Sequence, residues 1–155
     1  MTISMTGVVT GGAQTGFTSP TYTGTSDWIS EIGKQSVVTA TGGTQAGVLT
    51  HTPANPFTWT FLKPKVLKTL SGANPVTGVI SPVPFNRYKL IVRKGLIPYS
   101  SAVPRVGNVT CEFNIPAGCE LTDPANLRAM VSALVGLINT NSAGIGDTLV
   151  TSVIG

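Results

Sequence analysis

Two segments of the chain alternate polar and apolar residues with the two-residue period of a β-strand, Phe85–Lys94 and Val106–Ile115. In the first segment, Arg87, Lys89 and Arg93 fall on one face and apolar residues fall on the other. In the second segment, one face carries only polar residues: Asn108, Thr110, Glu112 and Asn114. If the two strands pair, they build a sheet that is polar and basic on one side and apolar on the other.

The first 60 residues are rich in Thr, Gly, Ser and Val, and turn signals such as Gly42-Gly43 divide them. Because β-branched residues favour strands, we expect short strands at Gly7–Thr10, Phe17–Thr23, Ser36–Thr41 and Val48–Thr52. A longer strand is expected over residues 57–70, at a sheet edge or with a bulge, because Pro64 cannot donate to a strand ladder. Residues 95–105 contain two prolines and are expected to form a loop.

The residues Thr122-Asp123-Pro124 are typical of a helix start, with a capping side chain followed by proline at the first helical position. Apolar residues then follow helical spacing: Leu127, Met130, Val131, Leu134, Val135 and Ile138. A second, short helix is expected from about Gly146 to Ile154.

The opposite face of the long helix is small and nearly uncharged: Ala125, Ala129, Ser132, Ala133 and Gly136. A helix that faces solvent normally carries Lys and Glu there, whereas small residues let another backbone approach closely. We therefore expect both faces to be packed, one of them by a partner subunit. The predicted dimer interface comprises Leu127, Met130, Val131, Leu134 and Gly136.

Charge is scarce and unevenly distributed. Only 10% of the residues are charged, against about 25% in an ordinary domain, which favours an oligomer over a monomer that Thr, Ser and Asn keep soluble. The net charge is +4, and residues 63–105 hold eight Lys and Arg residues without one acid. Such a field repels itself unless a polyanion faces it, and nucleic acid is the commonest such partner. The alternative is a solvated basic face without a ligand.

The basic strand face predicts an RNA-binding surface. Its cations are spaced by about 6.6–6.8 Å per two residues, which is comparable with the phosphate spacing of an extended single strand. Polar residues of the neighbouring strand can hydrogen-bond the edges of unpaired bases. The candidate RNA-binding residues are Arg87, Lys89, Arg93, Asn108 and Thr110, with Lys63 and Lys65 extending the patch.

No pattern in the sequence supports catalysis, a metal site or a cofactor site. His51 is the only histidine, and Cys111 and Cys119 lack the spacing of a zinc site. Phosphate-binding and dinucleotide-binding glycine motifs are absent. We expect a protein that is not an enzyme, needs no cofactor, and has neither a membrane span nor a signal peptide.

Several stretches within residues 85–155 carry a family resemblance: Asn86-Arg87-Tyr88-Lys89-Leu90-Ile91, Asn108-Val109-Thr110-Cys111-Glu112-Phe113-Asn114-Ile115-Pro116, Cys119-Glu120-Leu121, Asp123-Pro124-Ala125-Asn126-Leu127-Arg128-Ala129-Met130 and Asn141-Ser142-Ala143-Gly144-Ile145-Gly146-Asp147. In these stretches the chain resembles the coat proteins of single-stranded RNA bacteriophages (leviviruses). The first 60 residues agree with that family only in style, as a Thr- and Gly-rich hairpin followed by strands.

The resemblance implies an α+β fold in one domain, 1–155, with an N-terminal β-hairpin (1–30), a five-stranded antiparallel sheet (31–116) and two C-terminal helices (122–155). In that family two subunits interlock, each covering the sheet of the other with its helices, and the dimers build an icosahedral shell. The uncovered sheet face binds an RNA hairpin of the genome, which the strand alignment would place here on Arg87, Lys89, Arg93, Asn108, Thr110 and Glu112. Asn108 stands where well-known members stack an aromatic side chain on a base. The loop 95–105 would line the symmetry axes, and it lacks the cysteines that cross-link it in some members.

The residues and the resemblance together predict a structural capsid protein of the virion, assembled in the cytoplasm of a bacterial host. It would form homodimers and bind single-stranded RNA, and it would repress translation when it binds an RNA hairpin. No membrane partner is expected. Two other classes of protein fit the residues: a non-capsid dimeric RNA-binding regulator and a surface adhesin or fibre subunit. The lack of a signal peptide disfavours the last of these.

Overall fold

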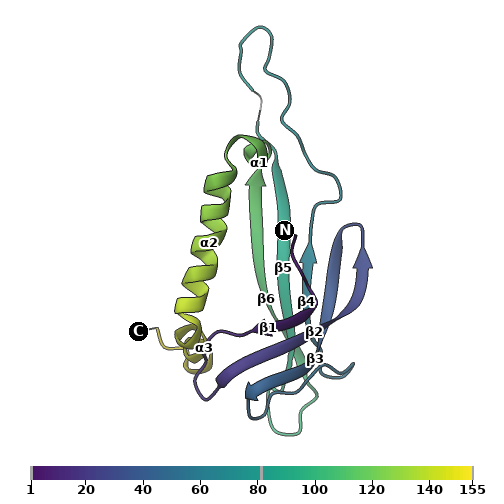
Figure 1. The fold of residues 1–155 in the computed structure, drawn as a ribbon, viewed down its shortest axis with the longest axis vertical. Helices are drawn as coiled ribbons and strands as arrows, with labels where there is room; N and C mark the ends of the chain where they lie inside the picture. Colours follow the sequence, from purple (N-terminus) through teal and green to yellow (C-terminus); the bar gives the residue numbers. More distant parts are fainter. Residues whose placement is uncertain (1, 81, 155) are drawn as a thin grey trace.

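The computed structural model describes residues 2–80 and 82–154. Within them the chain forms an antiparallel sheet whose six strands lie in chain order, followed by three helices (Figure 1). The strands are β1 (Gly7–Thr10), β2 (Thr18–Ser30), β3 (Gly33–Thr44), β4 (Phe57–Leu62), β5 (Phe85–Leu96) and β6 (Arg105–Pro116). The helices are α1 (Cys119–Thr122), α2 (Pro124–Thr140) and α3 (Ser142–Thr151). The α+β class is confirmed.

The N-terminal hairpin is part of the sheet, which corrects the expected five-stranded sheet with a separate hairpin. β1 pairs with β2 from Gly7 opposite Gly24 to Thr10 opposite Thr21, and β2 pairs with β3 on its other side. The register of β2 shifts after Thr23 and after Ser26, so one long bulged strand serves both the hairpin and the sheet. The predicted strand ended at Thr23, whereas β2 continues to Ser30.

The alternation predicted for β5 and β6 is confirmed by their register. Lys89 lies opposite Glu112, and Arg93 lies opposite Asn108. On the other face, Leu90 lies opposite Cys111 and also opposite Phe61 of β4. The sheet therefore has one polar face and one apolar face, as the period of two requires.

Two predicted strands are corrected. Residues 48–52 form no strand, because His51 fastens the connection instead: its backbone N–H donates to the Val38 carbonyl at 2.9 Å, and its Nδ1 accepts from the Phe57 N–H at 3.0 Å. The strand expected over 57–70 ends at Leu62. The Lys63 N–H still donates to the Ile32 carbonyl at 2.8 Å, and the chain leaves the sheet at Pro64, which has no N–H to donate.

The predicted start of the long helix is confirmed. The Asp123 side chain accepts a hydrogen bond from the Asn126 N–H, and Pro124 occupies the first turn. The last helix was expected over 146–154 and instead spans Ser142–Thr151. Its earlier start is held by the β1–β2 loop, because Gln14 Nε2 donates to the Ser142 carbonyl at 2.8 Å. Within the described residues, no single helix is long and apolar enough to cross a membrane; α2 and α3 meet the criterion only as a pair bent by 61°.

The apolar core of the single chain is thin. The buried hydrophobic residues are Met5, Val38, Phe57, Ile115 and Ala117. Among the helical residues, all of which the structure describes, none is buried. Figure 1 shows α2 running beside β6. One sheet and an uncovered helix leave much apolar surface in contact with solvent, which is unusual for a protein that works as a single chain.

Candidate nucleic-acid interface and assembly surfaces

The polar sheet face is built by two long neighbouring strands. Arg87, Lys89 and Arg93 of β5 share it with the β6 residues directly opposite them, Asn114, Glu112 and Asn108. Cross-strand partners share a face, so the cations and the polar residues form one continuous surface. The structure thus brings together the candidate residues of β5 and β6.

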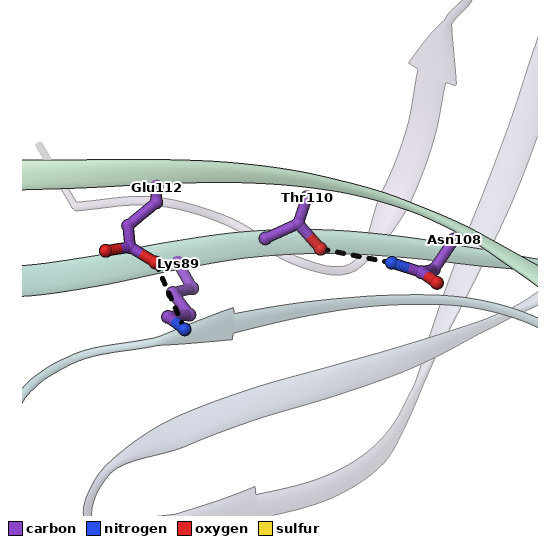
Figure 2. A network of polar contacts seen from close by, with 4 residues as sticks. All are labelled: Lys89, Asn108, Thr110 and Glu112. Atoms are coloured by element: carbon purple, nitrogen blue, oxygen red, sulfur yellow. Dashed lines mark hydrogen bonds and ion pairs between the residues drawn. The ribbon is translucent and has the colours of Figure 1, made fainter.

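One predicted cation carries an acidic partner. Lys89 Nζ lies 3.1 Å from the Glu112 carboxylate across the β5–β6 pair, as Figure 2 shows. The hydrogen bond from Lys89 is the main cause that lowers the pKa of Glu112, followed by a hydrogen bond with Asn114 and the positive charges of Lys89 and Arg87. The expectation of a basic field without an acid holds for the stretch 63–105, but in the fold Glu112 partly neutralises it.

The polar β6 residues near the middle of this face are exposed and available to a ligand. Asn108 Nδ2 donates to Thr110 Oγ1 at 3.3 Å (Figure 2). Asn108 lies opposite Arg93, and Thr110 lies opposite Ile91. An amide and a hydroxyl beside an arginine supply both donors and acceptors for the edges of unpaired bases.

A chain of side-chain hydrogen bonds, which the sequence did not predict, crosses four strands of this face. Arg93 Nη1 donates to Thr60 Oγ1 at 3.3 Å, Thr60 donates to Gln35 Oε1 at 2.8 Å, and Gln35 Nε2 donates to Asp27 Oδ2 at 2.6 Å. Thr60 is only 3% exposed, so both partners of its hydroxyl matter. The signal in the sequence was the alternation of threonines with aromatic residues in β4, residues 57–61.

Lys63 and Lys65 do not join the strand face. Both follow the end of β4, and Lys63 lines a hollow together with Lys34 and Phe61. Phe61 pairs with Leu90 and therefore lies on the apolar side of the sheet. Neither lysine is carried by a strand of this face, because β4 ends at Leu62, and their part in RNA binding stays a prediction.

Lys94 also lies on the apolar side of the sheet. Its Nζ donates to the Leu49 carbonyl at 2.8 Å and to Asn55 Oδ1 at 3.3 Å, and it sits 4.8 Å from the centre of the Phe57 ring. Burial lowers the pKa of this lysine. These contacts fasten the connection 45–56, so Lys94 has a structural role.

Two of the predicted dimer residues face this chain's own sheet across a hollow. Leu127 and Val131 line a hollow of about 230 Å³ with Tyr88, Phe113 and Ile115. Met130 is 50% exposed, Leu134 is half-buried, and a Cβ added at Gly136 would meet nothing within 4 Å. Packing on both faces of α2 therefore remains a prediction, because the chain alone leaves most of the helix uncovered.

Comparison with solved structures identifies the family. The chain superposes on a chain of the virus-like particle of bacteriophage ESE020 with a TM-score of 0.93 and 49% sequence identity, over 99% of this chain and 100% of that one. No family model and no curated protein sequence matches the chain.

The chain belongs to the bacteriophage coat proteins.

This membership accounts for the surfaces that the coat protein leaves uncovered. The described residues contain no group of three or more His, Cys, Asp or Glu that could hold a metal ion. Both cysteines of the coat protein, Cys111 and Cys119, are free within the chain and half-buried.

Proposed function

We propose that this coat protein forms homodimers that assemble into an icosahedral shell around single-stranded RNA. Assembly would take place in the cytoplasm of a bacterial host, and the shell would be that of the virion. The full-length similarity to a chain of a bacteriophage virus-like particle is the observation that carries the proposal. Translational repression by hairpin binding is part of the same proposal, since it uses the same sheet face.

The open edge of the sheet supports a dimer. β6 is the last strand in the sheet order, and no described strand pairs with its outer edge over Arg105–Pro116. A long unpaired edge is a template for another strand, and natural monomers usually shield it. Val109, on the apolar face of β6, is 67% exposed. A second copy that pairs with this edge and lays its α2 over the apolar face would satisfy both the backbone groups and the uncovered side chains.

Exposed apolar residues in the β5–β6 connection support contacts beyond the dimer. Ile97, Tyr99 and Val103 are all exposed, and Arg105 is the one charged residue of the predicted loop 95–105. We propose that this loop contacts copies around the symmetry axes of the shell. Its apolar side chains would make these contacts. A disulfide would not, because neither cysteine of the chain lies within the loop.

The charge of the polar face supports RNA as the ligand. Three cations of β5 face one acid of β6, which leaves the two strands with a positive excess. Phosphates supply affinity through such cations, while Asn108 and Thr110 can contact bases. The Arg93 guanidinium is already held toward the sheet by Thr60, so less conformational entropy is lost when a phosphate binds it.

Size-exclusion chromatography of the expressed protein with absorbance at 260 and 280 nm tests the proposal. A shell around RNA elutes as a megadalton particle with a nucleic-acid spectrum. A small species that binds RNA would instead indicate the dimeric regulator. Fibres free of nucleic acid would indicate an adhesin, and either outcome overturns the capsid proposal.

A further inference from the structure

The connection between β4 and β5, residues 63–84, forms a long projection that we call the arm. In its described residues, 63–80 and 82–84, it contains no helix and no strand. Figure 1 shows it extending past α1, beyond the end of the sheet. A connection this long usually has a function of its own in a compact domain.

The base of the arm is fastened to the sheet. Asn86 is 3% exposed, and its side chain makes two hydrogen bonds with the main chain of Lys68. Its Oδ1 accepts from the Lys68 N–H at 2.8 Å, and its Nδ2 donates to the Lys68 carbonyl at 3.0 Å. The returning end is held where the Ala117 N–H donates to the Pro84 carbonyl at 2.9 Å. Because these hydrogen bonds hold both ends of the arm at buried residues, Asn86 and Ala117, the arm leaves the sheet in a defined direction.

The tip of the arm is apolar and uncharged. From Thr69 to Asn86 the sequence has no charged residue. Val76 is 91% exposed, Val79 63% and Ile80 48%. The chain turns back between Asn74 and Val79, where the Asn74 N–H donates to the Val79 carbonyl at 3.0 Å, so these apolar residues lie at or beside the turn of the arm. Exposed valine and isoleucine are costly to leave in water, and the tip therefore has the properties of a contact surface.

The observations favour another copy of this chain as the partner. A polynucleotide would need cations, and the tip has none. The arm is also continuous with the apolar hollow between sheet and α2, because Leu67 lines that hollow with Leu127 and Val131, and Leu70 packs against Gly118. In the proposed dimer a second copy covers the apolar side of the sheet next to this hollow, so the foot of the arm at Leu67 and Leu70 adjoins surface that another copy would cover.

We propose that the arm is a subunit clasp: the apolar tip around Val76 and Val79 packs on a second copy of the chain and stabilises the assembled shell. The clasp rests on the proposed assembly function and adds a contact outside the helices and the β5–β6 loop.

Placing charge on the tip tests the clasp. The double variant Val76→Asp/Val79→Asp is compared with Ser71→Asp/Thr69→Asp, which adds the same charge nearer the base of the arm. We expect the tip variant to yield far fewer particles, about tenfold or more, or particles that dissociate at lower temperature, while its far-ultraviolet circular dichroism matches the wild type. Particles of normal yield and stability from the tip variant would overturn the clasp, and so would equal losses in both double variants.

A photo-cross-linking residue at position 76 in the otherwise unchanged chain gives a readout that does not depend on particle yield. Cross-linked pairs of coat protein chains support the clasp, whereas cross-links to RNA alone, or none, overturn it. The two proposals fail separately: if the unmodified protein forms no particles, the shell is wrong, and a chain-to-chain cross-link would still show that the arm binds a second copy.

Discussion

The hydroxyl of Thr60 accepts a hydrogen bond from the Arg93 guanidinium at 3.3 Å, although 33 positions separate the two residues in the chain. The same hydroxyl donates to Gln35, which donates to Asp27, so a carboxylate at one end of the chain of bonds is linked to a cation at the other. Thr60 is buried between them, and its hydroxyl is hydrogen-bonded to both Gln35 and Arg93. The basic face is therefore organised from β2 and β3 as well as from β5.

We predict that Gln35→Met weakens RNA binding about fivefold, which corresponds to about 1 kcal/mol, the net value of one hydrogen bond. The methionine keeps the volume of the side chain but leaves the Thr60 hydroxyl without its acceptor. Affinity for a short RNA measured by fluorescence anisotropy checks the prediction. Thr39→Val, which removes the Thr25–Thr39 hydrogen bond, is the matched control and should leave affinity unchanged.

A double-mutant cycle with Arg93→Gln separates positioning from a general structural effect. If Gln35 acts through Arg93, the loss caused by Gln35→Met disappears in the Arg93→Gln background. A loss of the same size in both backgrounds would contradict the role assigned to Gln35.

Charge reversal at Arg87 and Lys89 is expected to lower the RNA content of particles and to reduce the salt dependence of RNA binding, while the dimer stays intact. The control is the equal reversal at Lys63 and Lys65, which follow the end of β4 and belong to no strand, and which should have a smaller effect. The 260/280 nm absorbance ratio of purified particles measures the difference. Equal RNA content in the two double variants would refute the placement of the interface on β5.

Glu112 makes the basic face sensitive to acid. Because its pKa is lowered in the folded chain, the pair with Lys89 contributes stability above the ordinary pKa of the carboxyl, 4.5, and that contribution is lost as the pH falls through the lower folded value. Protonation also removes the one negative charge between Arg87 and Arg93 on these strands. RNA binding should therefore strengthen in this acidic range.

The variant Glu112→Gln is expected to show the strengthened binding at neutral pH, with a salt slope steeper by about 0.7, the value of one additional phosphate contact on a single strand. Titrations of wild type and variant against salt at pH 7 and over a series of pH values that descends below 4.5 give the comparison. RNA binding that responds to acid identically in both proteins would show that Glu112 is not the group responsible.

Gly136→Leu is expected to abolish assembly without unfolding the chain. Within the chain a Cβ at this position would meet nothing within 4 Å, so any clash must come from a partner subunit. Gly24→Ala is the contrasting control, because its Cβ would collide with the Trp59 ring and should lower the melting temperature of the chain itself. Normal particles from Gly136→Leu would show that α2 is not packed on its small-residue face.

The sequence by itself determined the features that depend on neighbours a few positions away. Alternation placed Arg87, Lys89 and Arg93 on one face of a strand, and the Asp123 cap with Pro124 set the start of α2, because period and capping are local properties.

The tertiary structure alone decided which distant groups meet. Glu112 neutralises Lys89, and Gln35 holds Thr60 against Arg93, through the register of strands that loops of different lengths bring together. Likewise, the hydrogen bond from the Phe57 N–H to His51 fixes residues 48–52, which have a strand-like sequence, as part of a connection. The end of β4 at Leu62 leaves Lys63 and Lys65 outside the strand. Pairing energy depends on the partner strand, which no local pattern specifies.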